Sequence, residues 1–303
     1  MMKLTIVSAL ILFAVGCITP SQKRNPAQAT SGESEASKAI TQYKETRHNS
    51  TQHVPHAPRK FTPVDTSGEE VETEPKGTAC GDERWDIKTL TDAAAEKDEN
   101  SFANNLLTIM QGPPTASVAK FVSSTYTPPK PWTPTLARMA DEAVLQKVAV
   151  QIIEYKLEAD HDYHIVITDL PSEASSKSTK TAAKTVNRTV AGFPRSMGPS
   201  SGPQTMIIES PDPQCPGGIA PNLVAIPDIY KNRFVEVRAE FDKIIAEHKG
   251  PAPQDQLYKV EPPIKVFVTG YPFFDKLHGQ TGVAPNGIEI HPILDLEEDI
   301  QAK

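Results

Sequence analysis

The chain has 303 residues, of which 38% are hydrophobic, and its formal net charge is −7 with a pI near 5.7. This acidic balance argues against a general nucleic-acid-binding protein, because such proteins need a basic surface to attract phosphates. The 28 prolines indicate a chain with many loops and short strands.

The N-terminus has the pattern of an export signal. Lys3 precedes an uncharged apolar run from Leu4 to Val15, which is too short to span a bilayer. We therefore expect residues 1–16 to be a signal peptide that is removed from the exported protein.

The end of the apolar run resembles the lipobox of bacterial lipoproteins, since small residues lead into a cysteine in Ala14-Val15-Gly16-Cys17. The resemblance implies cleavage before Cys17 and its modification with acyl chains such as palmitate. It also implies a bacterial cell-envelope protein held in a membrane by its N-terminal lipid. In a host with two membranes that would be the outer membrane, facing the periplasm, because Ile18 is not Asp. A secreted protein with an incidental cysteine is the alternative.

Residues 17–78 carry the candidate lipid-bearing cysteine and then a polar segment rich in Ser, Thr, Gln, Glu, Lys and Pro. Such a segment buries too little apolar surface to offset its ordering entropy, so it is predicted to be a disordered tether. Residues 79–303 are enough for a single globular domain with its own core. A short helix is expected near its start at Asp92–Asn100, with Thr91 or Asp92 as the N-cap.

Three strands are expected in the first half of the domain. Glu142–Glu158 is rich in β-branched residues that alternate between two faces, and a helix is the competing interpretation. Residues 148, 150 and 152 would share one face, and residues 149, 151, 153, 155 and 157 the other. After a polar turn at residues 159–162, Tyr163–Asp169 returns as the second strand of a hairpin. Residues 171–203 read as a mobile insertion before the third strand, Thr205–Glu209.

One long helix and two more strands are expected in the second half. Ile226–Glu247 has apolar residues at helical spacing and a proline suited to its first turn. Ile264–Gly270 is a strand, and a Gly-rich loop leads from it to a last strand that begins at Ile288. In that strand residues 288, 290, 292 and 294 would share one face, and residues 289, 291 and 293 the other. Pro292 lacks a backbone donor, which predicts an edge strand or a bulge there.

This order, β-β-β-α-β-β, defines the expected fold class: mainly β, with one long helix between the third and fourth strands. Five strands with a helix in that position are typical of an OB-like barrel. A different small barrel or a small α+β sandwich is the alternative.

Two cysteines remain in the domain, Cys80 and Cys215. An even pair in an exported chain favours a disulfide between them. Two separate thiols are the alternative. No Cys-x-x-Cys spacing is present, so the cysteines give no metal-site prediction.

Five separated motifs resemble a family of exported bacterial proteins of unassigned function. They are CGDERWDIKTLTD at residues 80–92, YKLE at 155–158, DYHIVI at 162–167, TMIIE at 205–209 and HGQTGVAPNGIEIHPIL at 278–294. The resemblance covers residues 79–298, and the insertion at 171–203 is longer here than in the family pattern. Since the family has no assigned activity, the resemblance supports the limits of the domain and implies no function.

The candidate site residues are carboxylates and histidines of these motifs and of the last loop: Asp162, His164, Glu209, Asp275, His278, Glu289 and His291. If they converge, such groups can hold a divalent cation that activates water, or they can transfer protons. The competing interpretation is that His164 and His291 make structural hydrogen bonds and that Glu289 lies on a solvated face.

Two functions stay open on this evidence. The first, which is favoured, is a lipid-anchored envelope protein whose OB-like module binds an unknown envelope ligand or has a structural role, with no enzyme activity and no cofactor. The second is a metal-assisted hydrolase of phosphodiesterase or nuclease type, which would need a divalent metal. Convergence discriminates between them, because a hydrolase needs three or more of these groups around one site.

Overall fold

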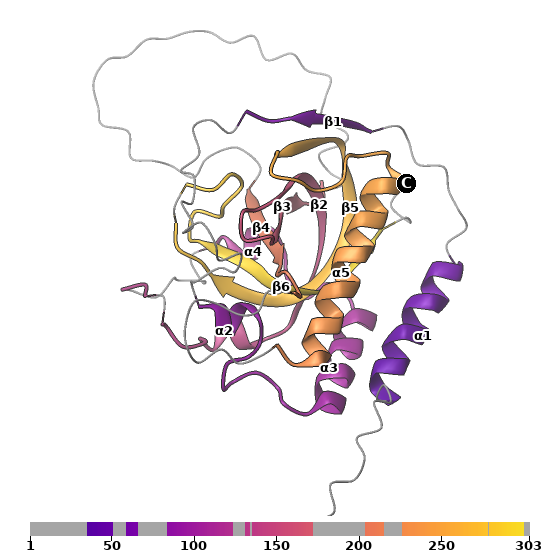
Figure 1. Cartoon of the computed structure of the whole chain (residues 1–303), viewed down its shortest axis with the longest axis vertical. Helices are drawn as coiled ribbons and strands as arrows, with labels where there is room; N and C mark the ends of the chain where they lie inside the picture. Colours follow the sequence, from indigo (N-terminus) through magenta and orange to yellow (C-terminus); the bar gives the residue numbers. More distant parts are fainter. Residues whose placement is uncertain are drawn as a thin grey trace, which may run out of the picture. The chain divides into compact units, whose positions relative to one another are not determined.

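The structure is a computed structural model of the chain (Figure 1), and it describes residues 35–50, 59–65, 84–123, 131–133, 135–171, 204–214, 226–277 and 279–299. The signal peptide, Cys17, both cysteines of the predicted disulfide, His278 and nearly all of the insertion 171–203 lie outside these residues, so the corresponding predictions stay predictions. In the described part of the chain, no helix is both long and apolar enough to cross a membrane.

The domain is mostly β, with a six-stranded mixed sheet and a few helices. The strands are β1 (Lys60–Pro63), β2 (Gln146–Leu157), β3 (Tyr163–Asp169), β4 (Thr205–Ser210), β5 (Tyr258–Phe274) and β6 (Ile288–Glu298). Their order is β1-β5-β2-β3-β4-β6, and β5 also pairs with β6. The pairings β5-β2-β3-β4-β6-β5 therefore form a closed ring of five strands, to which β1 is added at β5. All pairs are antiparallel except β4–β6, which is parallel.

The helical elements are α1 (Glu35–Ser50), α2 (Trp85–Lys88), α3 (Glu99–Gln111), α4 (Val118–Phe121), the 3₁₀ turn η1 (Asp141–Ala143) and α5 (Asp228–Glu247). The long helix and the strands around it match the predicted order, since α5 follows three strands of the ring and precedes the other two. Figure 1 shows α5 running beside the sheet, with α3 next to it.

The main core lies inside the ring and takes apolar residues from all five strands. On β3 the predicted alternation holds, because Ile165 and Ile167 enter the core while His164 points to the outer side. On β2 the alternation changes after Ile152, where the pairing register shifts by one residue against β3 and also changes against β5. Tyr155, predicted to face away from Ile152, therefore joins it in the core, because such a bulge reverses the sides that later residues occupy.

A second bulge lies in β6 around Pro292. Since β6 pairs with β4 on one side and β5 on the other, it is not an edge strand, and the predicted bulge is confirmed. The bulge also overturns the predicted side of Ile293, which enters the core together with Ile290. Gly270 allows the close approach there, because a Cβ on it would lie 2.5 Å from the carbonyl oxygen of Pro292.

Helices close the core on the outside. Residues in the second half of α5, such as Phe241 and Ile244, extend the main core, whereas Tyr230 and Phe234 in its first half join a second cluster with α3. The short helix expected at residues 92–100 is wrong in position. The helix begins at Glu99, because Asp98 caps it by accepting a hydrogen bond from the Ser101 amide at 2.8 Å.

Part of the predicted tether is ordered, so the prediction of a disordered segment is wrong for residues 35–50 and 59–65. Ile40 of α1 is 1% exposed in the second cluster, and the hydroxyl of Tyr43 donates to the Met110 carbonyl at 3.2 Å. β1 pairs with β5 through Lys60 to Pro63. The segment is polar on average, so its composition did not reveal these few apolar residues. Their side chains are buried against the domain rather than against one another.

Candidate functional site

A row of polar side chains crosses the outer side of β3, β4 and β6. His164 and Glu209 are direct partners in the antiparallel register of β3 and β4. The parallel register of β4 and β6 pairs Ile207 with Glu289, and its continuation places Glu209 beside His291. The contacts follow this register, since Glu209 Oε1 lies 3.1 Å from His164 Nδ1 and Glu209 Oε2 lies 3.0 Å from His291 Nδ1.

The turn between β2 and β3 adds three carboxylates to this row. Glu158 Oε1 lies 3.1 Å from His164 Nδ1. Asp160 accepts a hydrogen bond from the Asp162 amide at 3.0 Å, and Asp162 Oδ1 accepts one from the Asp212 amide at 2.9 Å. The Asp212 amide therefore holds Oδ1 of the Asp162 carboxylate, and Oδ2 lies 3.6 Å from His291 Nε2.

The loop between β5 and β6 covers the same place. The carbonyl oxygen of Thr281 lies 3.1 Å from His164 Nε2, and Gly282 packs on Val166 so closely that a Cβ would overlap its side chain. Gly282 has φ +82°, which a residue with a side chain rarely adopts. Asp275, at the start of this loop, accepts a hydrogen bond from the Gln280 side chain at 3.2 Å.

Lys88 at the end of α2 supplies a buried positive charge beside the row. Burial acts to lower the pKa of Lys88, but Asp275, Glu209 and Glu289 together raise it well above its usual 10.5. The ammonium also lies 5.4 Å from the ring centre of Phe273 on β5. We call this set the acid–histidine cluster: Lys88, Glu158, Asp160, Asp162, His164, Glu209, Asp275, Glu289 and His291.

His164 is an imidazolium in this environment. A carbonyl oxygen can only accept, so the contact with Thr281 requires a hydrogen on Nε2. Nδ1 faces carboxylate oxygens of Glu158 and Glu209 and must also carry one. Burial acts to lower the pKa of His164, but the charge of Glu158 and the hydrogen bonds to both glutamates raise it to about 10. Its three contacts, with Glu158, Glu209 and Thr281, satisfy both ring nitrogens, as expected for a structural histidine.

The carboxylates outnumber the cations. Six carboxylates meet Lys88, His164 and, at the edge, Lys156, which lies 3.3 Å from Glu158. Burial raises the pKa of Asp162 well above 3.8, as do the charges of Asp160 and Glu209. Burial and the charge of Glu209 raise the pKa of Glu289 in the same way. The described residues thus hold an excess of negative charge that disfavours ionisation of these groups.

Two triads within the cluster have a spacing suited to a metal ion. They are Glu158, His164 and Glu209, and Asp162, Glu209 and His291, each offering one ligand atom per residue within 4.8 Å of the others. The first triad is already held together by the His164 imidazolium. The second has no such cation, and its Asp162 Oδ2 and His291 Nε2 are buried without a hydrogen-bond partner among the described residues.

The structure brings together six of the seven predicted site residues: Asp162, His164, Glu209, Asp275, Glu289 and His291. The interpretation of Glu289 as solvated is wrong, since the residue is only 1% exposed. The predicted structural hydrogen bonds of His164 are confirmed. His278 lies outside the described residues.

Lys88, Glu158 and Asp160 belong to the cluster but were not predicted as site residues. Lys88 and Glu158 lie in motifs that carry the family resemblance, and Asp160 lies between two of them. Membership of these motifs is the signal by which the three residues could have been found. Nothing in the local sequence of Lys88 indicates that it turns toward strands more than 70 positions away.

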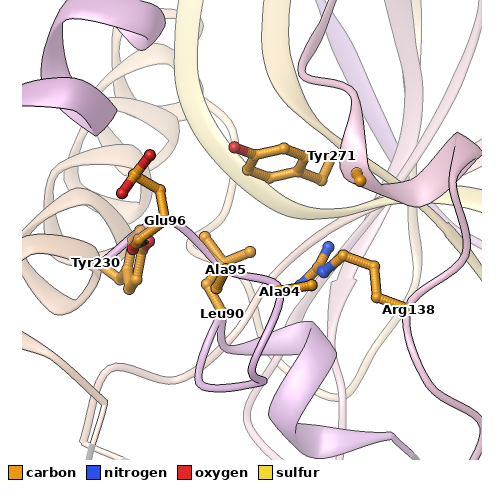
Figure 2. A pocket seen from close by; sticks show the side chains of 8 residues that line it. Leu90, Ala94, Ala95, Glu96, Arg138, Tyr230 and Tyr271 are labelled. Atoms are coloured by element: carbon orange, nitrogen blue, oxygen red, sulfur yellow. Dashed lines mark hydrogen bonds between the residues drawn. The ribbon is translucent and has the colours of Figure 1, made fainter. Parts of the chain in front are cut away.

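A separate small cavity lies between the segment of residues 90–96, α5 at Tyr230 and β5 at Tyr271 (Figure 2). Its volume is about 20 Å³, room for roughly one water molecule. Arg138 at its wall is already bound to Asp92 at 2.7 Å, and the Tyr230 hydroxyl donates to the Glu96 carbonyl. This cavity therefore suits one bound water and not a ligand.

Comparison with known proteins gives no match: no protein-family model, no curated protein and no solved structure is similar to this chain. The functional conclusions below therefore rest on the residues and their geometry.

Proposed function

We propose that the chain is a lipid-anchored protein of the bacterial cell envelope whose OB-like barrel binds a divalent cation at the acid–histidine cluster. The lipid anchor rests on the lipobox resemblance at Cys17. The sequence alone did not identify the ligand of this module, and we propose that the ligand is a divalent cation.

The strand pairings support the OB-like barrel. The five strands of the ring pair in the order β2-β3-β4-β6-β5-β2, with the parallel pair at β4–β6 and the long helix between the third and fourth strands of the ring. A five-stranded partly open barrel with a Greek-key order has these features. Function does not follow from such a fold, so the cation is argued from the cluster alone.

The excess of buried carboxylates is the observation that carries the cation. Isolated buried charge costs far more free energy than paired charge, so a protein neutralises it with protons, a partner or a metal ion. Here the partners that the described chain supplies are too few, and two ligand-type atoms in the middle of the cluster face each other without a donor. A divalent cation would supply the charge where those atoms lie.

Thermal unfolding with added metal tests the proposal on the full chain carrying Cys17→Ser, which prevents acylation. Residues from 35 onward must be kept because α1 and β1 contact the domain. Metal at one hundred times its Kd should stabilise the folded chain by about 2.7 kcal/mol, and a chelator should reverse the shift. Glu261→Gln, which removes an exposed carboxylate, should keep the effect. No shift with Mg²⁺, Ca²⁺, Mn²⁺ or Zn²⁺ would overturn the proposal.

Metal-assisted hydrolysis is a second candidate, favoured by one further observation. The cluster reaches the surface at Glu158, whose side chain is 16% exposed and therefore accessible to water. A carboxylate in that place can accept a proton from a metal-activated water. Hydrolysis of bis(4-nitrophenyl) phosphate by the metal-loaded chain, lost in Glu158→Gln while metal binding is kept, would support it. Metal binding without turnover would leave the cation-binding function alone.

A further inference from the structure

The two histidines of the cluster differ in the hydrogen-bond partners of their ring nitrogens. His164 has a partner for each ring nitrogen, and both must donate. His291 uses only one nitrogen: its Nδ1 lies 3.0 Å from Glu209 Oε2 and 3.3 Å from Glu289 Oε1. Since carboxylate oxygens accept, Nδ1 carries the hydrogen, and the lone pair of the neutral ring lies on Nε2.

The lone pair on His291 Nε2 has no donor among the described residues. Nε2 lies 3.6 Å from Asp162 Oδ2, which is itself without a hydrogen-bond partner in the described part of the chain. A proton shared between them would need a separation of about 2.7 Å, so this distance is too long for a hydrogen bond. Both residues are almost completely buried, at 0% and 1% exposure, so bulk water does not satisfy the two atoms.

The separation suits a metal ion between the two atoms. Zn²⁺ lies about 2.0–2.2 Å from imidazole nitrogen and carboxylate oxygen. Two such bonds spanning 3.6 Å enclose an angle of roughly 110–130°, from the tetrahedral value to somewhat above it. The hydrogen bond from Nδ1 to Glu209 then has the form of the carboxylate–histidine–metal arrangement, in which the carboxylate fixes the ring and raises its basicity.

Resting on the cation-binding function proposed above, we infer that His291 Nε2 and Asp162 Oδ2 are the primary ligands of a transition-metal ion such as Zn²⁺. Glu209 is the positioning residue that orients His291, and water completes the coordination. His164 is not a ligand, because neither of its nitrogens has a lone pair to offer. A ligand pair of one imidazole and one carboxylate favours Zn²⁺ over Ca²⁺ and Mg²⁺, which prefer oxygen ligands only.

Asp162→Asn provides the sharpest test because it should not unfold the protein. The amide oxygen can still accept from Asp212, and its NH₂ group would face the lone pair of His291 Nε2 in place of a carboxylate oxygen, which removes the repulsion between them. The variant should therefore be at least as stable as the parent chain without metal, while its affinity for Zn²⁺ falls by 100-fold or more. His291→Gln should lose Zn²⁺ binding to a similar extent.

The matched control is Glu261→Gln, which removes an exposed carboxylate outside the cluster. His164→Gln, which removes the other histidine of the same row, tests which histidine is the ligand. Its Zn²⁺ affinity, measured by equilibrium dialysis with ZnCl₂ on the folded full chain carrying Cys17→Ser, should stay within a few fold of the parent. The visible absorption of bound Co²⁺ is a second readout, and its tetrahedral bands should survive in His164→Gln and vanish in Asp162→Asn.

The outcomes separate the two proposals. Unchanged Zn²⁺ binding in Asp162→Asn, or loss confined to His164→Gln, would overturn the ligand assignment while leaving a cation site elsewhere in the cluster. Binding of Ca²⁺ or Mg²⁺ in place of Zn²⁺ would overturn the transition-metal assignment. Absence of binding with every divalent ion would overturn the cation-binding function itself.

Discussion

The buried pair of Arg84 and Glu142 gives a sharp prediction for stability. Both side chains are 0% exposed, and they form a two-point contact of 2.6 and 2.5 Å. Arg84 also donates to three backbone carbonyls, among them that of Phe274 at the end of β5. Because Arg84 directly precedes α2, this pair fixes the helix that carries Lys88 into the cluster.

Glu142→Gln should destabilise the fold by about 3–5 kcal/mol, the usual cost of breaking a buried ion pair. Each oxygen of Glu142 accepts two hydrogen bonds: Oε1 from Arg84 and Phe274, and Oε2 from Arg84 and Met139. Whichever oxygen becomes the NH₂ group of glutamine will face two donors. Each unsatisfied donor costs about 1–3 kcal/mol, and the uncompensated guanidinium adds to this.

Urea unfolding of the full chain carrying Cys17→Ser measures this cost, with Glu240→Gln on the outer face of α5 as the charge-matched control. The double variant Arg84→Met with Glu142→Leu should recover the part of the loss that comes from the uncompensated guanidinium, and the part that comes from the Phe274 and Met139 amides should remain. A loss below about 1 kcal/mol for Glu142→Gln would contradict the reasoning, because so small a cost is typical of an exposed ion pair.

Three further predictions address the covering loop, the N-terminal helix and pH. Gly282→Ala should lower the melting temperature because the left-handed φ and the overlap with Val166 both oppose a side chain. Adding Val166→Ala should restore part of the loss. An unchanged melting temperature in Gly282→Ala would refute the close packing. Ile40→Ala should cost about 2–5 kcal/mol in urea unfolding, as for other buried residues, whereas a free tether would show no change. Burial raises the pKa of Glu297 to about 7 even though the charge of Arg47 lowers it. The folded chain therefore binds more protons than the unfolded chain between pH 4.5 and 7, stability falls as pH rises through this window, and Glu297→Gln should flatten the decline measured at pH 5 and pH 7.5.

The regular elements of the domain could be predicted because their signals are local. Period-two alternation gave β2, β3 and β4, and helical spacing with a proline in the first turn gave α5 nearly to the residue. The two bulges were harder, since they change the pairing register and depend on the partner strand. Only the bulge at Pro292 can be predicted from the sequence, because proline lacks a backbone N–H donor.

Part of the candidate site could also be predicted from the sequence, because strand alternation is a local signal. His164, Glu209, Glu289 and His291 occupy strand positions opposite to the apolar ones, so alternation alone places them on a common outer side. The turn carboxylates and Lys88 join them only through the folded chain, because segments from residue 88 to residue 291 meet there. The prediction that Glu289 is solvated failed since nothing in the strand itself reveals that distant groups such as Lys88 and Asp275 gather around it.

The fold and the candidate site share the same strands and use their opposite sides. β3, β4 and β6 each send apolar residues into the ring and polar residues outward, so a shift of one residue in any of them would exchange the two sets. The bulge in β6 lies directly after His291, which keeps His291 outside while Ile293 returns to the core. Because the apolar core is complete without the cluster, the chain can bury surplus carboxylates on its outer side and still fold. The proposed binding site therefore lies on a scaffold whose apolar core is formed without the residues of the site.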